Sequence, residues 1–282
     1  MLLVLLGMMP LLPHISAYNY CHNESHSCIA ANKLHFMCRL DAELPPVATY
    51  RGTIPDTKLM HRIILKLING YRDRLASGFL ETRNKKMFPA AKRMRELIWD
   101  QELGYMARSH VATVSFKHSE CRSTQRFPMA GEALGVVGST TDKRSIFQIL
   151  KLNFDRMFDE HLFVEDPESL VSYFDASIHM DAGHFCTLIS DRISRVGCGV
   201  AMATDCGYDK SKGHCHFITC HFDFTNIHGS YVYKDGSPAS DCQIWGADPS
   251  KEYQHLCGNE QGIFEQDHGD EDLSNKTKVK GV

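Results

Sequence analysis

Apolar side chains recur at the helical period of 3.6 residues between positions 58 and 76. The recurring residues are Leu59, Ile63, Leu67, Tyr71 and Leu75. Gly78 follows at the place where a glycine commonly ends a helix. The pattern therefore predicts a helix over 58–76, with this stripe on its buried face.

A second helical pattern begins at Asp100 and extends to about Val114. Its apolar face carries Leu103, Met106, Ala107 and His110. The Asp100 carboxylate can accept hydrogen bonds from the free amides of the first turn, so Asp100 is the expected N-cap.

A run rich in β-branched and aromatic residues covers 183–189, and Val-Gly-Cys-Gly follows over 196–199. We interpret these as a buried strand and the start of a second strand, joined by a turn over 190–192. His184 heads the first run, directly after Gly183, which places an imidazole at the mouth of the expected sheet.

The N-terminus reads as a targeting segment. Residues 1–12 are apolar but too few to span a bilayer, and the small residues Ser16 and Ala17 follow. This pattern predicts a secretory signal peptide over 1–17, cleaved near Ala17. No later apolar stretch reaches the ~18 residues of a membrane span, so no span is expected.

Composition narrows the function classes. The chain has 282 residues, 43% hydrophobic and 23% charged, with a formal net charge of −3. This balance excludes the strongly basic surface typical of nucleic-acid binding. Eleven cysteines in a chain with a signal peptide predict a disulfide framework with one cysteine left over. Asn23 and Asn275 begin glycosylation sequons.

The two ends differ from the middle. Residues 18–57 carry Cys21, Cys28 and Cys38 with little periodicity, and we expect an extended arm attached by disulfides. Residues 259–282 have no apolar period; they are acidic from Glu260 to Asp272 and then carry Lys276, Lys278 and Lys280, which is typical of a disordered tail.

A series of motifs runs through the chain in a fixed order. It comprises Asn69-Gly70-Tyr71-Arg72, Trp99-Asp100, His118-Ser119-Glu120-Cys121, Gly131-Glu132, Phe158-Asp159-Glu160, Gly183-His184-Phe185, Val196-Gly197-Cys198-Gly199 and Cys220-His221-Phe222. Together they resemble the CAP superfamily of cysteine-rich secretory, antigen 5 and pathogenesis-related proteins. The N-terminal cysteines and a terminal pair, Cys242 and Cys257, are similar to the insect antigen 5 branch.

The resemblance implies an α+β fold, a three-layer α-β-α sandwich. We expect the CAP domain over 58–235 and a C-terminal disulfide hook over 236–258. The implied disulfides are Cys21–Cys38, Cys28–Cys121, Cys198–Cys220 and Cys242–Cys257. Cys206–Cys215 is added because the two lie across a turn that contains glycine. Cys186, in an apolar run, remains as a buried free thiol.

The resemblance also implies a cleft that holds two histidines and two glutamates. Carried over by motif, they are His118, Glu132, Glu160 and His184, with Glu165 as a rival for Glu160 because Met157 stands where the family usually has tryptophan. Imidazoles and carboxylates suit zinc or another divalent ion. A hydrogen-bonded cluster that only fixes the cleft, or acid–base catalysis, remains open as an alternative.

Two other motifs suggest reactive sites but lack the features that such sites need. His214-Cys215-His216 with Cys220-His221 resembles a zinc knot, but Cys215 and Cys220 have opposite strand parity and point to opposite faces. Ser119 lacks the Gly-x-Ser-x-Gly elbow of a serine nucleophile.

These observations predict a secreted, extracellular binding or effector protein. Its partner is an extracellular protein or a sterol or lipid ligand, and its cleft binds a divalent metal that is lost below about pH 6. The alternatives are a metal-dependent secreted hydrolase and an interaction protein with a vestigial cleft.

Overall fold

The computed structural model describes residues 20–21, 27–139, 144–206 and 213–260. The expected signal peptide, the sequons at Asn23 and Asn275, and the tail from 261 onward lie outside these ranges. Within the described ranges, no helix combines the length and hydropathy that a membrane crossing requires.

Seven α-helices and five strands are interspersed along the described residues. The α-helices are α1 (Ser27–Ala30), α2 (Leu40–Glu43), α3 (Lys58–Ala76), α4 (Gln101–Ala112), α5 (Ile146–Asp159), α6 (Pro167–Ser172) and α7 (Gly183–Leu188). Short 3₁₀ turns are η1 (Phe36–Cys38), η2 (Glu160–Phe163), η3 (Met180–Ala182) and η4 (Cys242–Trp245). The strands are β1 (Thr49–Thr53), β2 (Ile98–Trp99), β3 (Gly131–Ser139), β4 (Arg195–Thr204) and β5 (His214–Phe222).

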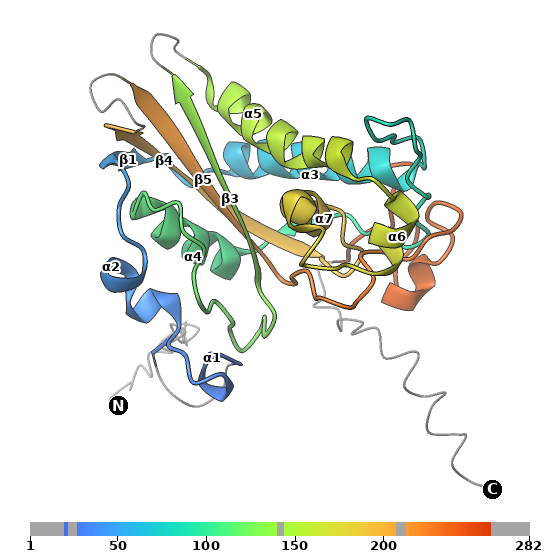
Figure 1. Ribbon diagram of the computed structural model, residues 1–282, viewed down its shortest axis with the longest axis horizontal. Helices are drawn as coiled ribbons and strands as arrows, with labels where there is room; N and C mark the ends of the chain where they lie inside the picture. The colour runs from blue at the N-terminus through green and yellow to red at the C-terminus, as the bar shows by residue number, and fades with distance from the viewer. Residues whose placement is uncertain (1–19, 22–26, 140–143, 207–212, 261–282) are drawn as a thin grey trace, which may run out of the picture.

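One sheet forms the middle layer, with strand order β1-β4-β5-β3 and the short β2 parallel to β4. The long pairings β3–β5, β4–β5 and β1–β4 are antiparallel. Figure 1 shows α3, α5 and α7 on one side of the sheet and α4 on the other. The expected α+β, three-layer α-β-α architecture is confirmed.

Helix α3 has the bounds that its apolar period predicts. The Thr57 hydroxyl accepts from the Met60 amide at 3.2 Å, and Gly78, at φ +78°, follows the last turn in a conformation that favours glycine. The buried face lies one position from the predicted stripe along most of the helix, because Leu59 is 57% exposed and Ile63, Leu67 and Tyr71 are only partly buried. The buried stripe instead follows Met60 through Ile64 and Ile68, which pack in one cluster with α5 and the sheet.

Helix α4 lies very close to the sheet because glycines line the contact. Asp100 caps it as predicted, accepting from the amides of Glu102 and Leu103. A Cβ atom added at Gly197 of β4 would lie 2.0 Å from the Gly104 amide nitrogen and 2.5 Å from its Cα. The two backbones therefore touch without side chains between them.

The predicted strand over 183–189 is wrong, because these residues form helix α7. A short apolar run is compatible with a buried strand or a buried helix, and period alone does not separate them. The deciding contact is tertiary: the Phe185 amide in the first turn donates to Glu160 at 2.9 Å. The next strand is confirmed, with β4 beginning at Arg195.

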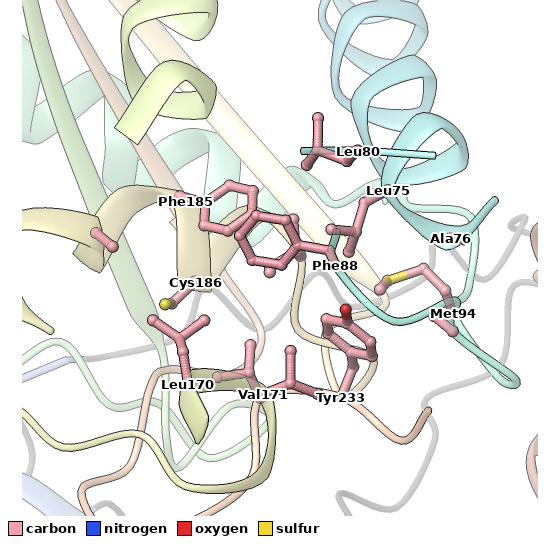
Figure 2. Close-up of a cluster of buried hydrophobic side chains, with 14 of the residues drawn as sticks. Leu75, Ala76, Leu80, Phe88, Met94, Leu170, Val171, Phe185, Cys186 and Tyr233 are labelled. Atoms are coloured by element: carbon pink, nitrogen blue, oxygen red, sulfur yellow. The ribbon is translucent and has the colours of Figure 1, made fainter. Parts of the chain in front are cut away.

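Cys186 of α7 is a free thiol inside an apolar cluster. Figure 2 shows it near Leu170, with the Phe88 and Phe185 rings in the middle of the cluster. The two rings meet edge to face, with centroids 5.2 Å apart. Burial raises the pKa of the Cys186 thiol far above its ordinary range, so the thiol stays protonated at neutral pH.

The N-terminal arm is more structured than the expected extended segment. It contains the short helices α1 and α2, and its last residues form β1, which pairs with β4 at the sheet edge. The expected boundary at 57/58 thus falls between a strand of the sheet and α3.

Five disulfides join the remaining cysteines. They are Cys21–Cys38, Cys28–Cys121, Cys198–Cys220, Cys206–Cys215 and Cys242–Cys257, the same pairs as expected. Cys215 and Cys220 of β5 bond on opposite sides of the sheet, since Cys220 packs with α3 and α5, and Cys215 packs with Val111 of α4.

Candidate metal centre

Glu132 is the buried carboxylate at the start of β3. The strand register places it opposite His221 of β5, and both side chains are fully inaccessible. His221 Nε2 lies 3.0 Å from Glu132 Oε2, and His110 Nδ1 of α4 lies 2.9 Å from the same oxygen. The Ser119 hydroxyl donates to it as well, at 2.8 Å. Oε2 is thus surrounded by three donors from three segments.

The other oxygen of Glu132 faces the cleft. His118 Nδ1 lies 2.7 Å from Oε1, and the Ser119 amide donates to Oε1 at 3.0 Å. His118 follows α4 in a loop, and its side chain is 56% exposed. Because Nδ1 is engaged by the glutamate, Nε2 is the ring nitrogen left for a ligand.

Glu160 and His184 repeat this arrangement. His184 Nδ1 lies 2.6 Å from Glu160 Oε1, while Glu160 Oε2 accepts from the Phe185 amide. His184 Nε2 is buried and has no hydrogen-bond partner among the described residues. The ring centres of His118 and His184 are 6.5 Å apart. The structure therefore brings together all four residues that the resemblance implies, and the rival Glu165 is an exposed residue that lines a separate pocket.

Glu132 carries its negative charge at neutral pH. Burial alone would raise its pKa, but the Arg122 guanidinium and the hydrogen bonds from His110, His118 and His221 outweigh burial and hold the pKa well below its usual value. Burial lowers the pKa of His221 to about 4 despite the neighbouring carboxylate. His221 is consequently neutral and gives Glu132 a single proton-bearing nitrogen.

The cleft histidines have the chemistry of metal ligands. A histidine that binds a metal usually donates its other ring N–H to a carboxylate, and both rings here have Nδ1 within hydrogen-bonding distance of a glutamate. The unpartnered His184 Nε2 fits a ligand at this place.

Among the described residues, His110, Glu132 and His221 form a group that could hold a metal ion, with ligand atoms within 4.8 Å of one another. If His110 Nδ1 and His221 Nε2 bound a metal, the ring protons would sit on His110 Nε2 and His221 Nδ1. Both of those atoms are buried without a hydrogen-bond partner. Unpaired buried donors are costly, so the hydrogen-bonded arrangement suits this trio better.

The sequence pattern did not reveal His110 and His221 as site residues. His110 reads as one more position on the buried face of α4, and His221 as part of the rejected zinc knot. The available signal was chemical: a histidine buried in an apolar pattern needs a polar partner. Ser119, considered as a nucleophile, is buried and donates its hydroxyl proton to Glu132.

The part of the chain that carries this site matches a known protein family. The model of the CAP family, described as the cysteine-rich secretory protein family, matches residues 65–222. The chain belongs to the CAP family. The match includes all four cleft residues as well as His110 and His221.

Among curated CAP relatives, venom allergen-1 of Aedes albopictus is 29% identical over 252 residues, which cover 87% of this chain and 89% of that protein. The antigen 5 like allergen Cul n 1 of Culicoides nubeculosus is 33% identical over 165 residues, covering 58% and 67%. Among solved structures, NaASP2 with Zn²⁺ aligns with a TM-score of 0.56 and 20% identity, over 72% of this chain and 98% of that chain. That likeness shows the shared fold.

Proposed function

We propose that this CAP protein is secreted and acts outside the cell as a binding or effector protein that holds a divalent metal between His118 and His184. The observation that carries the proposal is the matched pair of imidazoles, each with Nδ1 held by a different glutamate. Disulfides persist in oxidising, extracellular compartments, and ten of the eleven cysteines are paired.

His118 and His184 would hold the ion through Nε2, and Glu132 and Glu160 orient the two rings. A bound zinc ion with two protein ligands supplies a Lewis-acidic centre with positions open to water or to an exogenous ligand. The NaASP2 structure is described with Zn²⁺, which makes zinc the first ion to test.

Isothermal titration with zinc at pH 7.5 and 5.5 tests this proposal. We expect binding at pH 7.5 and weaker binding at pH 5.5, because protons compete with the metal for imidazole nitrogen. The His118→Ala/His184→Ala variant should lose the binding, whereas His214→Ala/His216→Ala, which removes two histidines at the far end of β5, should keep it. Equal affinity in wild type and the cleft variant would contradict the assignment. Zinc-dependent peptide hydrolysis that His184→Ala abolishes would favour the hydrolase alternative.

A groove between α3 and α5 favours a lipid as a second ligand. Its volume is about 390 Å³, and its lining is mostly apolar, with Ile63, Leu67, Tyr71 and Phe147. Lys66 and Arg74 also line it, as does Lys151, which is ion-paired with Asp155 at 2.6 Å. An apolar floor beside basic groups suits a long-chain carboxylate, whose tail is buried and whose charge is paired.

Binding of a fluorescent polyunsaturated fatty acid, followed by its change in fluorescence, tests the groove. Leu67→Glu places a carboxylate among the lining residues and should abolish binding. Leu59→Glu makes the same change at an exposed position of the same helix and should bind as wild type does. Identical binding by both variants would exclude this groove as the site.

A further inference from the structure

His110 and His221 stand behind the cleft and do not reach it. Their side chains are fully buried, and His110 Nδ1 and His221 Nε2 lie 2.9 and 3.0 Å from the same oxygen of Glu132, Oε2. The Ser119 hydroxyl completes the set of donors on that oxygen. A carboxylate oxygen with three donors from α4, β5 and the loop after α4 has no freedom to rotate.

The chemistry of the carboxylate fixes the protons on both rings. An ionised carboxylate accepts only, and a neutral imidazole carries a single N–H. The nitrogens that face the carboxylate, Nδ1 of His110 and Nε2 of His221, therefore carry the protons of the two hydrogen bonds. Their opposite nitrogens, which have no partner among the described residues, then carry lone pairs, not protons. An unpaired buried acceptor is easier to tolerate than an unpaired buried donor.

The consequence reaches His118 through the second oxygen. With Oε2 occupied, Oε1 stays directed at His118 Nδ1, so the His118 proton also sits on Nδ1. The lone pair that could bind a metal is then on Nε2, the nitrogen away from Glu132. If His110 and His221 did not hold Oε2, the carboxylate would keep only its contacts with Ser119, Arg122 and His118, and the His118 ring could exchange tautomers or rotate.

We propose that His110 and His221 are positioning residues for the cleft: by holding Glu132 Oε2, they fix His118 as the Nδ1–H tautomer with Nε2 free for a divalent metal. Metal binding at His118 Nε2 rests on the proposed function. The tautomer of His118 is a property of the metal-free protein and is tested separately.

The first experiment measures zinc affinity in four variants. Glutamine places its amide near the position of histidine Nε2, and asparagine near that of Nδ1. His221→Gln and His110→Asn therefore keep the donor, while His221→Leu and His110→Leu remove it. We expect each leucine variant to weaken zinc binding about 10- to 100-fold, the usual effect of losing a partner of a metal-binding histidine, and the amide variants to stay within about 3-fold of wild type.

Epistasis separates positioning from general damage. In a His118→Ala background, His221→Leu should cause no further loss of zinc affinity, because its effect passes through His118. An additional loss of 10-fold or more there would overturn the proposal. Unchanged affinity in both leucine variants, with zinc binding intact in wild type, would also overturn it and leave the cleft site standing.

The second experiment uses the metal-free wild-type protein. Long-range ¹⁵N–¹H NMR spectra of the imidazoles report which nitrogen carries the proton. We expect Nδ1–H for His110 and His118 and Nε2–H for His221. An Nε2–H tautomer at His118 would refute the proposal even if the leucine variants do not fold. If wild type binds no zinc but shows these tautomers, the proposed function fails, whereas the positioning of Glu132 and His118 by His110 and His221 stands.

Discussion

The backbone contact between α4 and β4 gives the sharpest test of the packing. In Gly197→Ala, the new methyl group would lie 2.0 Å from the Gly104 amide nitrogen, whereas ordinary contacts begin at 3.4 Å. The obstacle is helix backbone, which cannot turn aside as a flexible side chain can. Helix and strand must separate by more than about 1 Å in a close-packed interior. Overpacking usually destabilises by 1–3 kcal/mol, and we expect about 3 kcal/mol or more here.

Thermal unfolding followed by circular dichroism measures this effect. At roughly 2–4 °C per kcal/mol for a domain of this size, the Tm of Gly197→Ala should fall by about 6–12 °C. The matched control is Gly70→Ala, in the middle of α3, where an added Cβ meets nothing within 4 Å. Since alanine favours helix over glycine, the control should gain about 0.5–1 kcal/mol. A Tm for Gly197→Ala within 2 °C of wild type would show that the contact is not as tight as described.

Two further predictions concern buried ionisable groups. Because folding lowers the pKa of His221 from 6.5 to about 4, the unfolded chain binds the proton more readily, and stability should fall as the pH drops from about 6.5 toward 4. Between pH 7 and 5 this residue should lower the free energy of unfolding by about 2 kcal/mol, measured by urea unfolding with a chelator present. The His221→Gln variant should lack this loss, and an identical pH dependence in the variant would count against the assignment. Cys186 should resist iodoacetamide at pH 8 in the native protein and be alkylated once per chain after denaturation, as mass spectrometry can show. Alkylation of the native protein within minutes would mean that the thiol is accessible.

Local signals determined how much of the fold was predictable. Helix α3 has both an end signal at Gly78 and an apolar period, and its bounds were predicted correctly. The buried stripe lies one residue from the predicted one because neighbouring residues such as Leu59 and Met60 are both apolar, and only packing against α5 and the sheet decides between them. The run over 183–189 was assigned to a strand because its helical form depends on Glu160, a residue more than twenty positions away.

Some residues of the candidate site could be predicted from local motifs, and others could not. His118, Glu132, Glu160 and His184 stand inside recognisable motifs, so their convergence could be expected. His110 and His221 stand in α4 and β5, and only the register of β3 against β5 brings His221 opposite Glu132. Their role was therefore missed, since strand pairing between distant segments leaves no trace in local spacing.

The burial of Glu132 affects how the site can change during evolution. Its carboxylate joins α4, the loop after it, β3 and β5. Replacing it would leave two buried imidazoles and the Arg122 guanidinium without this hydrogen-bond acceptor. Removing one member of such a buried network commonly destabilises by several kcal/mol. Selection for a folded chain alone would thus preserve Glu132 in a descendant that had lost its cleft ligand. The exposed His118 has no comparable protection, so among relatives His118, more than Glu132, is the position whose retention signals a working cleft.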